Sequence, residues 1–141
     1  MENAYESREA SVSEAQKHVP GTIIGFDLTV PDAEAIREFY AAVVGWRPEP
    51  FDMGGYADYF MQAPESGQTV AGIVHARGEN ADLPPQWLTY VVVENLDASL
   101  ERCRAGGGTV VTAVKGGEDG ARYCVIQDPA GAYLALMQIG G

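Results

Sequence analysis

The sequence predicts an α+β fold in which two tandem βαβββ modules form curved sheets with pseudo-two-fold symmetry. The first observation is an element order of strand, helix and three strands that occurs twice. The second is self-similarity at a constant spacing, since Val30 matches Val93 and Gly45 matches Gly108, each pair 63 residues apart. The third is the length of 141 residues, which suits one domain. Two copies of so long a period exclude a solenoid and a propeller.

The chain begins with a segment that we predict to be an N-terminal tail, residues 1–21, because it is polar and lacks hydrophobic periodicity. A β-rich run over 22–30 predicts the first strand, which ends before Pro31. Asp32 is a predicted N-cap for a helix over 33–44, whose apolar residues recur at helical spacing and which Gly45 ends.

The remaining elements follow from turn signals between β-rich runs. Strands are predicted over 46–53, 56–63 and 69–76, which complete module one at 22–77, and a polar linker follows at 78–86. In module two, over 87–139, we predict a strand at 87–94, a helix at 96–104 and strands at 109–115, 122–127 and 133–139. One domain over 22–139 is expected.

Charge and composition limit the partners and the location. Acidic residues outnumber basic ones 20 to 9, and the formal net charge of −11 repels nucleic acid and anionic membrane surfaces while favouring a cationic ligand. No apolar run reaches the roughly 20 residues of a membrane span, and no secretory signal is visible. Cys103 and Cys124 have no metal-binding spacing. These features predict a cytoplasmic protein.

Short motifs in both modules resemble the vicinal-oxygen-chelate family, which includes glyoxalase, bleomycin-resistance protein and extradiol dioxygenase. In module one they are Phe26–Asp32, Phe39-Tyr40 and Gly45-Trp46. In module two they are Val93–Asp97, Gly106–Val110 and Gln127–Gly131. The resemblance covers about residues 22–139. It implies that the sheets form a cup, and that in the metal enzymes of the family a divalent metal is held by the first and last strands of each module.

The family's metal positions, carried onto this sequence, hold side chains that cannot coordinate. They fall at Gly25, Ala71, Leu88 and Ala135, whereas zinc and first-row metals need imidazole, carboxylate, amide or thiolate donors. We therefore expect no metal and no other cofactor. The family also includes drug-sequestering proteins that bind their ligand without metal between the subunits of a dimer, which implies a homodimer here.

Strand alternation predicts which residues face the cup, because residues two apart point to the same side. The candidate ligand-binding residues are Asp27, Thr29, Ile73, Tyr90, Val92, Tyr133 and Met137. Asp27 and His75 are the candidate catalytic bases. Each also has a structural interpretation, Asp27 as a carboxylate bonded to backbone and His75 as a strand-end histidine. Trp46 and Trp87 are interpreted as structural.

Three functional hypotheses remain open. The first is a glyoxalase- or bleomycin-resistance-like protein that binds a small organic molecule, aromatic or cationic, in the cup or a dimer cleft without metal, for drug resistance or transport. The second is an enzyme, a lyase, an isomerase or dioxygenase-like, that uses Asp27 or His75 as a base or an unorthodox metal site. The third is a dimerisation module without ligand.

Overall fold

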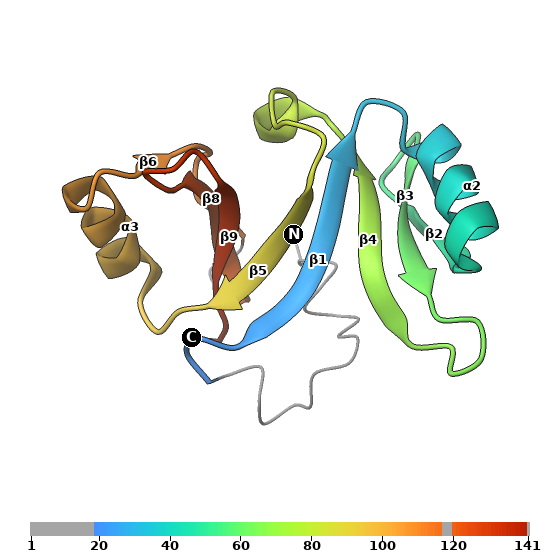
Figure 1. Ribbon diagram of the computed structural model, residues 1–141, viewed down its shortest axis with the longest axis horizontal. Coiled ribbons are helices and arrows are strands. Elements are labelled where there is room, and N and C mark those ends of the chain that lie inside the picture. Colours follow the sequence, from blue (N-terminus) through green and yellow to red (C-terminus); the bar gives the residue numbers. More distant parts are fainter. Residues whose placement is uncertain (1–18, 117–119, 141) are drawn as a thin grey trace. The chain divides into compact units, whose positions relative to one another are not determined.

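Figure 1 shows the computed structural model, which describes residues 19–116 and 120–140. The α+β class is confirmed, and so is the repeated order of a strand, a helix and further strands, although one predicted strand of the second set is divided into two. The first set comprises β1 (Ile23–Val30), α2 (Ala33–Val44), β2 (Arg47–Asp52), β3 (Ala57–Gln62) and β4 (Thr69–His75). The second comprises β5 (Trp87–Val92), α3 (Leu96–Ala105), β6 (Thr109–Val110), β7 (Lys115–Gly116), β8 (Arg122–Gln127) and β9 (Tyr133–Gln138).

The chain divides into two compact units, whose bounds differ slightly from those of the predicted modules. From here on, module one and module two mean these two units. Module one is Gly25–Trp87, and module two is Leu88–Gly141 together with the residues up to Ile24. In module one the strands are hydrogen-bonded in the order β2-β3-β4-β1, and in module two in the order β5-β9-β8-β6, with β7 also on β8. The first and last strands of each module, β1 with β4 and β5 with β9, pair in parallel.

Each sheet is covered on one face by the helix of its own module (Figure 1). In module one Ala33, Ile36 and Tyr40 of α2 pack against apolar side chains of β1, β3 and β4. In module two Leu96 and Leu100 of α3 pack with residues of β8 and β9. We call the opposite face of each sheet its distal face. Among the described residues no helix is long and apolar enough to cross a membrane.

Both helices begin and end where local sequence signals place them. The side chain of Asp32 accepts a hydrogen bond from the Ala35 amide, and Gly45 ends α2 in the left-handed conformation with φ 89°. Asn95 caps α3 in the same way through the Ala98 amide. Capping satisfies amides that have no partner within the helix.

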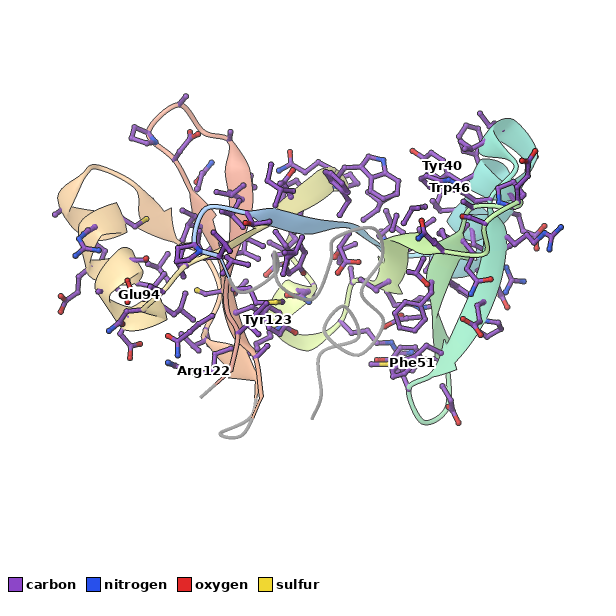
Figure 2. All side chains as sticks on the ribbon, turned by 90° about the horizontal axis from the view of Figure 1, so that it is seen from below. Tyr40, Trp46, Phe51, Glu94, Arg122 and Tyr123 are labelled. Atoms are coloured by element: carbon purple, nitrogen blue, oxygen red, sulfur yellow. The ribbon has the colours of Figure 1, made fainter. Side chains whose placement is uncertain are left out.

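Trp46 and Trp87 pack against the module one core, beside Tyr40. The Trp87 indole Nε1 donates to the Tyr40 hydroxyl at 3.2 Å. Tyr40 and Trp46, both labelled in Figure 2, have ring centroids 5.9 Å apart. The two tryptophans thus belong to an aromatic cluster at the edge of the module one core.

The structure departs from the predicted elements at two places. The strand predicted over 109–115 is two short strands, because the amides of Val111 and Thr112 both approach the carbonyl of Val125, at 2.8 and 3.4 Å, as in a β-bulge. The predicted linker contains a 3₁₀-helix, η2, at Gly78–Asn80. Most of the predicted tail, residues 1–18, lies outside the described residues, and Gly21 at its end donates to the Val92 carbonyl at 2.8 Å.

Candidate functional site

The pairing of β1 with β4 decides which side chains share the distal face of module one. Asp27 pairs with Gly72, and Leu28 pairs with Ile73. Paired residues of neighbouring strands project to the same side of a sheet. Since Leu28 and Ile73 pack in the core with α2, Asp27 and Gly72 lie on the distal face. By alternation, Gly25 and Thr29 share that face with Asp27.

The predicted placement of Ile73 and Ala71 beside Asp27 is wrong. Both are core residues beneath α2, and Ile73 is 0% exposed. The error is one residue of register, which moves every side chain of a strand to the opposite face. Ala135 pairs with Tyr90 just as Gly72 pairs with Asp27, so Gly72, not Ala71, is the counterpart of Ala135.

The Asp27 carboxylate lies directly over the backbone of Gly72. A Cβ atom built on Gly72 would overlap with the nearer carboxylate oxygen of Asp27. Only glycine therefore leaves this room without a shift of the carboxylate. Asp27 itself is half-buried, whereas Thr29 is buried.

Aromatic side chains on the neighbouring strands extend this face. Phe60 of β3 pairs with Gly72, and Phe51 of β2, labelled in Figure 2, meets Phe60 edge to face with ring centroids 5.3 Å apart. Beside them the Gln62 amide donates to the Glu49 carboxylate at 2.9 Å. The sequence interpretation did not include Phe51 and Phe60. No alternation of aromatic and non-aromatic residues marks Phe60 in the sequence, because it directly follows Tyr59.

On module two, the predicted residues do share the distal face. Tyr90 pairs with Ala135 and Val92 with Met137, while Leu134 and Leu136 point to α3. Most side chains of this face are buried. The buried residues are Leu88, Tyr90, Val92, Ala135 and Met137. Tyr133 and Tyr123 are half-buried. A ligand on this face would therefore meet these two tyrosines first.

Tyr123 is a further residue that sequence reasoning did not include in the site. It pairs with Met137, and its ring centroid is 6.2 Å from that of Tyr90 (Tyr123 is labelled in Figure 2). The two rings give the module two face an aromatic surface of the kind that lines small-molecule sites.

His75 belongs to a different cluster from Asp27. One carboxylate oxygen of Asp58, Oδ1, accepts from the His75 amide at 2.9 Å and lies 3.2 Å from Nδ1 of the imidazole. The imidazole also meets the Tyr56 ring at 5.4 Å. His75 is three residues beyond Gly72 on the same strand, a separation of about 10 Å. The two predicted bases are thus not brought together.

The residues at the family's metal positions do not fit a divalent metal. In module one the first and last strands offer Gly25, Asp27 and Gly72, with a single carboxylate. In module two they offer Leu88, Tyr90 and Ala135, with only a phenol. Across residues 19–116 and 120–140 no group of three or more His, Cys, Asp or Glu side chains could hold a metal ion. Metal sites require several such donors at once.

Curated relatives resemble this chain over most of its length. "Putative glyoxylase CFP32" of Mycobacterium tuberculosis is 32% identical over 119 residues, which are 84% of this chain and 46% of the relative. "Anthracycline biosynthesis protein DnrV" of Streptomyces peucetius is 26% identical over 139 residues, covering 88% of this chain and 49% of the relative. The chain thus spans about half the length of these relatives.

Solved structures with the same fold include glyoxalase I from Zea mays, with TM-score 0.58 and 20% identity over 86% of this chain and 44% of that one. Methylmalonyl-CoA epimerase from Mycobacterium tuberculosis gives TM-score 0.51 and 20% identity over 93% and 94% of the two chains. The likeness to these structures concerns the fold. The family model "Glyoxalase/Bleomycin resistance protein/Dioxygenase superfamily" matches residues 22–136, and the chain belongs to that superfamily, the vicinal-oxygen-chelate family that its motifs resemble.

Proposed function

We propose that this chain binds a small organic molecule on the distal face of its sheets without a divalent metal, as a drug-resistance or carrier protein does. The observation that carries the proposal is the surrounding of Asp27. Its carboxylate lies over Gly72, and Gly72 pairs on the next strand with Phe60, a member of the Phe51–Phe60 aromatic pair. This face combines apolar surface with few polar groups, as ligand sites do.

The ligand class that suits this face is an aromatic cation. Phe60 is only 4% exposed, so the half-buried ring of Phe51 is the one that can contribute apolar contact area and attract a cation to its face. The Asp27 carboxylate supplies the opposite charge. The net charge of −11 raises the local concentration of cations. A relative named for anthracycline biosynthesis supports a ligand with a flat aromatic body.

The proposal includes a homodimer in the cytoplasm. A dimer is supported by analogy with the family and by large apolar side chains left exposed on α2, where Phe39, Val43 and Val44 are 55%, 63% and 49% exposed. Cys103 and Cys124 are free thiols, as is usual in a reducing compartment.

Calorimetry with two ligands of similar shape tests the site. 9-Aminoacridine is a cation at neutral pH and acridine is neutral. We expect Asp27→Asn to weaken binding of the cation by about 1–3 kcal/mol, because a charge-assisted contact is lost, and to leave acridine unchanged. Asp82→Asn removes the same charge from an exposed linker position and should leave both affinities unchanged. Equal affinities for the cation in wild type and Asp27→Asn would contradict this role.

Elemental analysis of protein purified without chelators tests the metal-free part. We expect substoichiometric zinc, nickel, manganese and iron, because each module offers at most one good ligand at the family positions. About one tightly held metal ion per chain would contradict it.

The competing function is an enzyme that uses a side chain as a base. One specific observation favours it, the contact between Asp58 and His75.

A further inference from the structure

We propose that Asp58 positions His75 as a proton acceptor, with Nε2 of the imidazole as the atom that takes a proton from a bound ligand. The ligand class is a small molecule with an acidic O–H or C–H group. The inference goes beyond ligand binding on the Asp27 face, because it concerns the His75 end of β4 and needs no contact with Asp27.

The first step is the tautomer of His75. An ionised carboxylate only accepts hydrogen bonds, so the 3.2 Å contact between Asp58 Oδ1 and His75 Nδ1 requires the proton to be on Nδ1. In the neutral imidazole Nε2 then carries the lone pair. The carboxylate also compensates the positive charge that the ring acquires when Nε2 takes a proton.

The second step is the rigidity of the arrangement. The same Oδ1 accepts from the backbone amide of His75 at 2.9 Å, so it holds both the main chain and the ring of one residue. The paired residues of β3 and β4 begin at Tyr59 and Ile73, and beyond this pair the Asp58 side chain accepts from the His75 amide. Asp58 is only 9% exposed. The contact with the backbone amide alone would satisfy the end of the strand. The contact with the imidazole is not needed for that purpose, so it acts on the ring itself.

The third step is access. The Tyr56 ring packs perpendicular to the imidazole, at an interplanar angle of 86°, and the Arg77 guanidinium stacks on Tyr56 at 3.6 Å. The His75 side chain keeps 18% of its surface exposed.

In the proton transfer, the ligand's bond to hydrogen breaks, its electron pair stays on the ligand and an N–H bond forms at Nε2. Return of the proton to another ligand atom completes an isomerisation with no other reactant.

Nitrogen-15 NMR of the imidazole tests the positioning directly. In a His18→Gln background, which leaves one histidine, we expect His75 to be protonated at Nδ1 when neutral. Asp58→Ala should shift it toward the Nε2-protonated form that predominates when Nδ1 has no acceptor. Asp58→Asn retains an acceptor oxygen and should preserve more of the Nδ1-protonated form. Asp52→Ala is the matched control, since Asp52 also accepts a backbone amide, from Gly54 at 2.8 Å, and should leave the tautomer unchanged.

Chemical modification tests access to Nε2. Diethylpyrocarbonate acylates an imidazole nitrogen that carries a lone pair, and we expect it to modify His75 while circular dichroism shows that the protein remains folded. Two outcomes would each overturn the proposal without any variant at Asp58. One is a wild-type His75 protonated at Nε2, and the other is a His75 that stays unmodified until the protein unfolds. Loss of ligand binding in Asp27→Asn would not affect either measurement.

Discussion

At the scale of single residues, the distal face of module one depends on an absent side chain. Gly72 has no Cβ, and the Asp27 carboxylate occupies the space where one would lie. The carboxylate can therefore rest directly on the backbone of the neighbouring strand. The position of the charge that we assign to ligand binding therefore depends on the absence of a side chain at Gly72.

Gly72→Ala should displace that carboxylate. We expect a loss of about 1 kcal/mol in the free energy of unfolding, because overpacking a filled position costs stability but the end of a side chain can move. Urea denaturation measures it. In an Asp27→Ala background the same substitution should cost less, since the overlapping atoms are gone, and the difference is the coupling of the two residues. An equal cost in both backgrounds would show that something other than Asp27 opposes the Cβ.

At the scale of elements, the helix boundaries were predictable because their determinants are local. The bounds of α2 coincide with the predicted 33–44, since a cap, a helical apolar spacing and a left-handed glycine all lie within its own sequence. The break between β6 and β7 was not predictable in this way. It depends on Thr112, whose hydroxyl accepts from the Val125 amide at 3.1 Å, a contact between β8 and the segment that joins β6 to β7.

The residues of the candidate site were predictable only where the alternation of side chains along a single strand was enough to assign them to a face of the sheet. Asp27, Tyr90 and Met137 are placed correctly by period two alone, but Ile73 is not, because its face is set by pairing with β1. The Asp58–His75 contact joins residues 17 apart. Its one local signal is a carboxylate amid apolar residues of a buried strand, since a buried charge needs a partner.

The two caps make a prediction about the helices. Asp32→Ala and Asn95→Ala should each lower the free energy of unfolding by about 1 kcal/mol, because each removes an acceptor from a first-turn amide. Those amides belong to Ala35 and Ala98. Thermal or urea unfolding provides the measurement. Glu101→Ala, an exposed change within α3, should alter stability by no more than about 0.5 kcal/mol. If the two cap substitutions lower the free energy of unfolding no more than this control does, water replaces the capping side chains as hydrogen-bond acceptors without a loss of stability.

At the scale of the whole molecule, charge acts on the proposed assembly as well as on the ligand. Each chain carries a formal net charge of −11, so two copies repel one another. The repulsion extends over the Debye length, about 30 Å at 0.01 M salt and about 8 Å at physiological ionic strength. Apolar contacts, by contrast, are not weakened by salt. The two contributions can therefore be separated by changing ionic strength.

A homodimer held by apolar contacts should consequently become tighter as salt is added. We expect light scattering at 0.01 M sodium chloride to show more of the 15.1 kDa monomer than at 0.5 M, where screening removes most of the repulsion. Sodium sulfate at matched ionic strength should favour the dimer further, because sulfate strengthens apolar burial. A dimer that weakens with salt would have to be held by ion pairs between subunits. The monomer mass at every salt and protein concentration would remove the dimer from the proposal and leave the sheet faces of one chain as the ligand site.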